Sequence, residues 1–247
     1  MEAPKGRGSS SVTISNPTQQ PVRIQLSLSA WEMTDESKII IKDKDESKGS
    51  VIDFVKMNPR QFTIEPFKKR VIRIAAAIPP NFEDGEYRLL LNILEIGAQR
   101  KKLNAPEKFN FGLIINRQVS AGTYVRKGNP ANLDSDLNIK SIDLKRDGNK
   151  INYTITYQNN GNIHTRRSLG VKYFDNSGLL IAEKKRQGGF LAIPTINDTS
   201  RSYSSGFAIP DEILKNKDAA QLEFTFIDEP LGDLGRKESI KSEMMKF

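Results

Sequence analysis

The sequence contains no cysteine and a single histidine, His164, and each of these shortages excludes a class of site. Without cysteine the chain forms no disulfide, carries no thiolate nucleophile and builds no cysteine zinc site. With one histidine, a metal site would need carboxylates for its remaining ligands, and a nucleophile–histidine–acid triad could be built only around His164. We therefore expect no catalytic residues, no metal site and no cofactor, and we interpret the protein as a non-enzyme.

The sequence also lacks long apolar runs, and none approaches the length that spans a bilayer. The opening residues, MEAPKGRGSSS, lack the apolar stretch of a signal peptide. We therefore expect a protein that is not embedded in a membrane. It is either cytoplasmic or the mature or truncated form of an exported protein.

The formal net charge is +8, from 38 Lys and Arg against 30 Asp and Glu. The basic residues are scattered among the acidic ones, and no nucleic-acid-binding motif is present. The charge therefore indicates a solvated basic surface, and we expect no nucleic-acid partner. Two basic clusters lie at residues 68–70 and 184–186. Such clusters usually lie on solvated faces or protect sheet edges against aggregation, and the alternative is that they bind an acidic partner.

Alternation of apolar and polar residues, the pattern of half-buried β-strands, is what the sequence has in abundance. Turn signals such as Asn16-Pro17 and Asp147-Gly148 separate the alternating segments. Residues 211–217 are the strongest candidate for a short helix. Expected strand segments of the first half lie within residues 10–16, 21–31, 38–43, 51–59, 60–80 and 85–96. Short strands with turns between them and no amphipathic helix predict an all-β protein of two tandem immunoglobulin-like β-sandwich domains.

A polar stretch rich in Gly, Pro and Asn divides the chain. We predict a first domain over residues 1–125, a linker over 126–136 and a second domain over 137–229. The last segment, residues 230–247, is polar and charged and is expected to be a loosely held tail.

Residues 107–119, EKFNFGLIINRQV, raise a question of function. In this stretch Phe109, Phe111, Leu113 and Ile115 are each separated by one residue, so a strand would present them all on one apolar face. That face either packs into the core of its own domain, as alternating strands usually do, or is offered to another chain.

Three ordered segments of the first domain resemble the periplasmic pilus and fimbrial assembly chaperones, a family with two Ig-like domains. The resemblance covers roughly residues 3–126 and marks the chain as a divergent member. The segments are SSSVTISNPTQQPVRIQLSLSAW; NPRQFTIEPFKKRVIRI; and GEYRLLLNILEI with the basic loop and FNFGLIINRQV that follow.

The resemblance implies how the apolar face would be used. In this family the strand at the FNFGLII position completes the unfinished sandwich of a pilin subunit, which is one form of β-augmentation. By resemblance, Phe109, Phe111, Leu113 and Ile115 are the subunit-binding residues, and pilin-like β-sandwich subunits are the partners. The same resemblance implies a periplasmic location and delivery to an outer-membrane assembly pore. The exposed edge also raises the possibility of self-association.

The family holds the subunit's C-terminal carboxylate with two basic residues, and this chain departs from that pattern. The first basic residue has no counterpart, and the second aligns nearest to Val119. Arg117 lies two residues earlier, on the same face of a strand, and is the best anchor, because an arginine binds a carboxylate through two nitrogens. The alternative is that Arg117 is a solvated surface residue.

Two functions therefore remain open. The first is a periplasmic chaperone that caps pilus or pilus-like subunits by donating a β-strand. The second is a structural or adhesive Ig-like protein that stays within a cell-envelope assembly, which the departures from the family's pattern favour.

Overall fold

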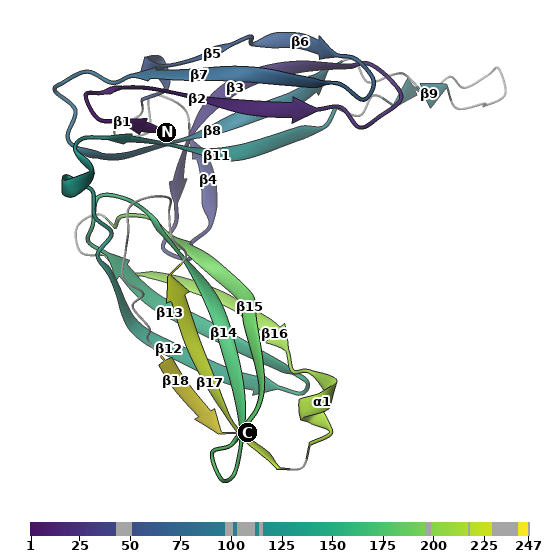
Figure 1. The fold of residues 1–247 in the computed structure, drawn as a ribbon, viewed down its shortest axis with the longest axis vertical. Coiled ribbons are helices and arrows are strands. Elements are labelled where there is room, and N and C mark those ends of the chain that lie inside the picture. Colours follow the sequence, from purple (N-terminus) through teal and green to yellow (C-terminus); the bar gives the residue numbers. More distant parts are fainter. Residues whose placement is uncertain are drawn as a thin grey trace. The chain divides into compact units, whose positions relative to one another are not determined.

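The computed structural model describes residues 1–42, 51–96, 101–102, 112–113, 116–195, 199–216, 218–228 and 242–246. Nearly all of the regular structure in these residues is β-strand, which confirms the all-β class (Figure 1). The chain divides into two compact units. The first comprises Met1–Glu32 and Ile40–Asn132, and the second comprises Met33–Ile39 and Leu133–Phe247.

The first unit contains two sheets. The larger has the strand order β1 (Glu2–Ala3), β11 (Gln118–Lys127), β8 (Gly85–Ile96), β3 (Val22–Met33) and β4 (Ile39–Lys42), with β6 (Gln61–Ile64) also paired to β3. The smaller has the order β2 (Arg7–Ser15), β7 (Lys69–Ala77) and β5 (Val55–Asn58). A two-stranded pair, β9 (Lys101–Lys102) and β10 (Gly112–Leu113), and the 3-10 helices η1 (Ile52–Phe54) and η2 (Pro130–Asn132) complete the unit.

The second unit also contains two sheets. One has the order β12 (Leu137–Asp147), β13 (Lys150–Asn159) and β16 (Arg201–Ala208). The other has the order β15 (Leu180–Ala192), β14 (Thr165–Asp175), β17 (Ala219–Asp228) and β18 (Ser242–Lys246). A single short helix, α1 (Asp211–Leu214), begins where the sequence predicts one and ends three residues earlier.

The strand orders are those of immunoglobulin-like sandwiches. If the main strands of the first unit are lettered A to G in chain order, the smaller sheet is B-E-D and the larger contains G-F-C. In the second unit the sheets are A-B-E and D-C-F-G. In each unit strands next to each other in sequence repeatedly belong to opposite sheets. This confirms the two tandem Ig-like sandwiches that the sequence predicts.

Each sandwich has its own apolar core, built by the alternation read from the sequence. In the first unit Ile72, Leu89 and Leu91 are fully buried, and they come from both sheets. In the second, Tyr157 and Phe224 lie among a cluster of buried aromatic rings. Burying such side chains is the main favourable term for folding, at roughly 1.5–3 kcal/mol each.

Two of the expected segment boundaries differ from the structure. Arg126 and Lys127, expected to open the linker, are the last residues of β11. Residues 242–246, expected within the polar tail, form β18, which pairs with β17 in the register Leu222↔Met245. In both places charged residues occupy a strand, so composition alone places the segments outside the fold.

Candidate partner-binding edge

β11 is an edge strand for most of its length (Figure 1). On one side it pairs with β8 without interruption, from Gln118↔Leu94 to Lys127↔Gly85. On its other side the two residues of β1 pair only with Arg126 and Lys127. Among the described residues, no strand covers this side of Gln118–Thr123. A row of backbone N–H and C=O groups along such an edge is a template for pairing with another strand.

The hydrogen-bond pattern identifies the residues that face the open side. The Glu95 amide donates to the Arg117 carbonyl at 2.9 Å, so the odd-numbered residues of β11 face β8. The even-numbered residues face away, as Arg126 shows by donating its amide to the Met1 carbonyl at 2.9 Å. By the same alternation, Gln118, Ser120 and Gly122 present their N–H and C=O groups outward.

The interior of the sandwich is open beside this edge. Val125 and Val119 lie on the same, core-facing side of β11, because they are an even number of residues apart. Val125 is fully buried, whereas Val119 is 63% exposed. The core-facing side of β11 is therefore buried at Val125 and becomes exposed toward Val119, at the start of the strand. An apolar side chain from an incoming strand would find Val119 accessible there.

β1 closes the other end of the edge and connects it to the second sheet. After pairing with β11 the chain turns at Gly6, which has a φ of +74°, and continues as β2. A Cβ on Gly8 would collide with the Glu2 carbonyl oxygen, so only glycine permits the crossing there. β2 pairs with β7 alone and is the edge of the smaller sheet. The free edges of both sheets therefore lie on the side that β1 crosses.

The residues predicted to donate a strand fall mostly outside the described part of the chain. Phe109, Phe111 and Ile115 lie there, so the structure places none of them. Leu113 belongs to β10 and pairs with Lys101 of β9. Asn116 and Arg117 separate β10 from β11, and the strand that pairs with β8 begins at Gln118. The donor-strand assignment therefore stays a prediction.

Arg117 lies at the open end of the edge in an exposed ion pair. Its Nε donates to Glu95 Oε2 at 2.9 Å, and its Nη2 lies 2.9 Å from the same oxygen. The arginine side chain is 70% exposed and that of Glu95 is 18% exposed. Such surface pairs are worth about 0–1 kcal/mol, so the guanidinium can exchange its partner at low cost.

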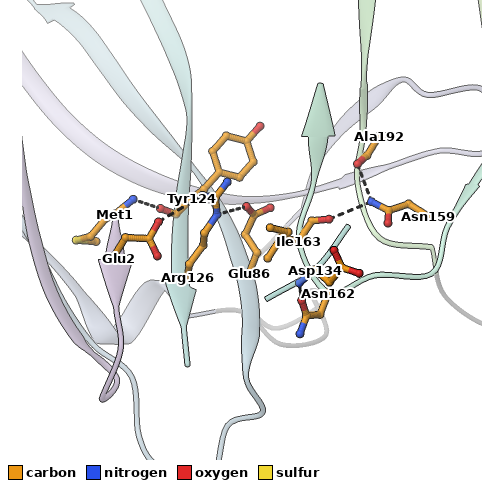
Figure 2. A network of polar contacts seen from close by, with 10 residues as sticks. All are labelled: Met1, Glu2, Glu86, Tyr124, Arg126, Asp134, Asn159, Asn162, Ile163 and Ala192. Carbon is orange, nitrogen blue, oxygen red and sulfur yellow. Dashed lines mark hydrogen bonds and ion pairs between the residues drawn. The ribbon is translucent and has the colours of Figure 1, made fainter. Parts of the chain in front are cut away.

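Arg126, which the sequence analysis did not single out as a site residue, forms a buried charge cluster at the other end of β11 (Figure 2). Its Nε donates to Glu86 Oε2 at 3.1 Å, and its Nη1 donates to Glu2 Oε1 at 3.3 Å. Lys127 is buried beside it, donating to the Phe82 carbonyl at 2.7 Å and to Asp84 Oδ1 at 3.1 Å. The sequence carries no signal for this cluster, because the apolar positions Val119, Ala121 and Val125 end before the two adjacent cations.

Trp31, the single tryptophan, is buried on the outer face of the larger sheet and lies outside the apolar core cluster. Its ring makes an edge contact with that of Tyr124 at 6.4 Å, and the guanidinium carbon of Arg88 lies 5.9 Å from the centre of the Trp31 ring. Arg88 and Tyr124 face each other in the pairing of β8 with β11. The aromatic pair thus covers the end of β11 that precedes Arg126.

In the second unit, polar groups gather at the ends of β13 and β14. Asn159 is fully buried and donates to the carbonyls of Ile163 at 3.0 Å and Ala192 at 2.9 Å (Figure 2). Its Oδ1 accepts from the Gly161 amide at 3.1 Å. His164 follows this turn and is buried. These contacts fix a loop and offer no open coordination site.

The described ranges hold no group of three or more His, Asp or Glu residues placed to bind a metal ion. In the same ranges no helix has the length and hydrophobicity needed to cross a membrane.

Comparisons with known proteins give likeness in structure only. No family model and no curated protein matches the sequence. The chain is similar to the class 5 fimbriae chaperone CfaA, with 12% identity, a TM-score of 0.49 and coverage of 98% of this chain and 95% of that one. It is also similar to a structure of the CsuC–CsuE chaperone–tip adhesion subunit pre-assembly complex of Acinetobacter baumannii, with 16% identity, a TM-score of 0.48 and coverage of 98% and 93%. A third likeness is to the Pseudomonas aeruginosa CupB2 chaperone, with 14% identity, a TM-score of 0.41 and coverage of 95% and 91%. All three of these structures contain a chaperone.

Proposed function

We propose that this protein is a periplasmic chaperone that captures pilin-like β-sandwich subunits by strand pairing at the open edge of β11 and delivers them to an outer-membrane assembly pore. The observation that carries the proposal is the free edge at Gln118, Ser120 and Gly122, beside an exposed Val119. A subunit that lacks a strand can pair with this edge, because its own open edge also leaves backbone N–H and C=O groups without partners.

The predicted donor residues fit this edge by their spacing. Phe109, Phe111, Leu113 and Ile115 are all odd-numbered, as is Val119 on the core-facing side of β11. A strand that continued β11 toward its N-terminal end without a bulge would therefore present all of them on the same side as Val119. Insertion of four such side chains into a subunit would contribute roughly 6–12 kcal/mol before ordering and association costs are subtracted.

Arg117 is proposed to release the Glu95 carboxylate and to bind the subunit's C-terminal carboxylate in its place. Its exposure and its weak surface pairing support this role. Substitution of Arg117 by Ala is then expected to weaken subunit capture by about tenfold, which is the range of one charged hydrogen bond. Substitution of Glu95 by Gln frees the guanidinium and should leave capture equal or stronger. Equal losses in both variants would mean that the pair only stabilises the fold.

The test of strand pairing uses two substitutions at one position. Ser120→Pro removes an N–H that faces the open side and leaves the ladder to β8 intact, which is where edge strands tolerate proline. Ser120→Ala keeps that N–H and removes only the hydroxyl. The protein, tagged at its C-terminus, is purified from its native cell envelope and its partners are identified by mass spectrometry.

We expect the wild type and Ser120→Ala to carry a small β-rich subunit in near-equal amount, and Ser120→Pro to lose it. Phe111→Asp, which leaves β11 untouched, should lose it as well. Capture that survives both Ser120→Pro and Phe111→Asp contradicts the proposal. Recovery of the protein as a component of purified filaments would instead assign it to the structural or adhesive class.

A further inference from the structure

The three strands of the smaller sheet of the first unit carry charge of one sign only. Strands β2, β7 and β5 contain no Asp or Glu. Four exposed cations lie on their outward side, and within the described residues none of the four forms an ion pair. The four are Arg7, Lys56, Lys69 and Arg73. We call this surface the basic face.

The register shows how the basic face is laid out. Arg73 lies on the central strand between Ser11 of β2 and Asn58 of β5. Lys69, four residues earlier, pairs with Ser15, so the two cations are about 13 Å apart along the strand. Lys56 lies one row beyond Arg73 on β5, opposite Ala75. Cations therefore alternate with hydroxyl and amide groups over a broad, shallow surface rather than gathering at one point.

An exposed aromatic residue, Phe67, lies in the turn that leads into β7 of the basic face. Phe67 lies in the turn between β6 and β7, with the Lys68 amide donating to the Glu65 carbonyl at 3.1 Å. Its φ is +58°, in the left-handed region that disfavours a bulky residue. The turn has Pro66 before it, and glycine or asparagine is the usual occupant of the position that Phe67 holds. Phe67 is nevertheless 67% exposed, so neither turn geometry nor packing accounts for a phenylalanine there.

The outer side of β7 adds a second exposed apolar residue. Val71 is 59% exposed and lies between Lys69 and Arg73 on the outward side of the strand. Flat basic surfaces that also expose aromatic and aliphatic side chains match the interface of an anionic bilayer. The cations meet phosphate groups there, and the apolar side chains reach the acyl boundary.

We propose that the basic face binds the surface of a membrane that contains anionic phospholipid, with Phe67 entering the interface. Charge complementarity selects this partner, because the three strands offer only positive charge. The exposed Phe67 and Val71 fit a lipid surface, because both side chains can reach its apolar region while the cations meet the phosphates. This surface belongs to the other sheet from β11, so it is independent of subunit capture.

The experiment measures sedimentation of the full chain with vesicles of phosphatidylcholine and with vesicles of an equal mixture of phosphatidylcholine and phosphatidylglycerol. Binding is expected only to the mixed vesicles, and it should weaken as salt is raised. Lys69→Glu combined with Arg73→Glu should reduce binding by about tenfold or more. The matched control is Lys145→Glu combined with Lys150→Glu, which makes the same change in net charge at exposed positions of the second unit and should bind as the wild type.

Phe67→Gly separates insertion from charge. Glycine suits the positive φ, so this variant should be at least as stable as the wild type to urea, yet bind the mixed vesicles more weakly. Equal binding to both vesicle types, or equal losses in the two charge variants, overturns the proposal. So does tighter binding to polyglutamate or single-stranded DNA than to the mixed vesicles, with no effect of Phe67→Gly. Ser120→Pro should bind the vesicles normally, which keeps this test apart from that of subunit capture.

Discussion

Arg126 and Glu86 face each other directly across β11 and β8, and their side chains form a buried ion pair with 3.1 Å between Nε and Oε2. The Glu86 side chain has no exposed surface, and that of Arg126 has 10%. Glu2, from β1, approaches the same guanidinium from a half-exposed position. The pair therefore joins three strands at the end of the sheet where β1 covers the edge.

Removal of one partner of this pair should be costly. Glu86→Gln leaves the Arg126 guanidinium buried without its closest negative charge, and we expect a loss of about 3–5 kcal/mol in the free energy of unfolding. Urea denaturation measures it. Glu95→Gln, which breaks the exposed pair with Arg117, serves as the control and should cost less than about 1 kcal/mol. Similar costs for the two variants would show that the burial of Arg126 does not matter.

Gly8→Ala should displace β1 from the edge. The added methyl group would overlap the backbone of Glu2, so one of the two strands must move. We expect a loss of about 2 kcal/mol or more, within the range of backbone clashes at glycine positions. Hydrogen exchange gives the local readout, because the Arg126 amide, bonded to the Met1 carbonyl, should exchange faster. Unchanged protection of that amide would refute the expected displacement.

Asn159→Asp should destabilise the second unit. A carboxylate cannot donate to the Ile163 and Ala192 carbonyls, and it would repel them in a fully buried site. We expect a cost of about 3 kcal/mol by denaturation. The neighbouring Asn160 is exposed and donates to Asp136 Oδ2 at 3.4 Å, so Asn160→Asp loses one exposed contact and should cost about 1 kcal/mol or less. The idea fails if both substitutions are tolerated equally.

Alkaline pH should weaken the second unit through Tyr173. Burial, with a smaller contribution from Glu212, raises the pKa of Tyr173 from 10.0 to about 12. Between these values the unfolded chain loses the phenolic proton while the folded chain keeps it. The free energy of unfolding therefore falls as pH rises, by about 1.4 kcal/mol per pH unit for one such group. Its contribution is unchanged below pH 10.

Tyr173→Phe tests this dependence, since phenylalanine has no proton to lose. Unfolding in urea across the alkaline range should show a shallower decline in the variant than in the wild type. A residual slope is expected, because burial also raises the pKa of Tyr153 and Tyr157. An identical decline in both proteins would assign the pH dependence to other groups.

The sequence predicted the strands better than their partners. Alternation placed strands over β3 and β7, because each buries one face and the period of two is visible in the residues. It missed that Arg126 and Lys127 lie inside a strand, since a charged residue in sequence carries no sign of the carboxylate that meets it across the sheet.

The site was predictable in part for the same reason. Sequence indicated that the segment ending in β11 offers a strand, but which backbone groups point outward follows from the pairing with β8. The turn residue Phe67 gave no signal at all in the sequence, because its exposed and left-handed conformation is a property of the folded backbone.

The direction of β1 has a practical consequence. This strand runs parallel to β11, and the Met1 amine already donates to the Tyr124 carbonyl at 2.9 Å. Any peptide fused ahead of Met1 is thereby aimed along the open edge, toward Gly122 and Ser120. An affinity tag at that end would act as a competing strand in every capture experiment.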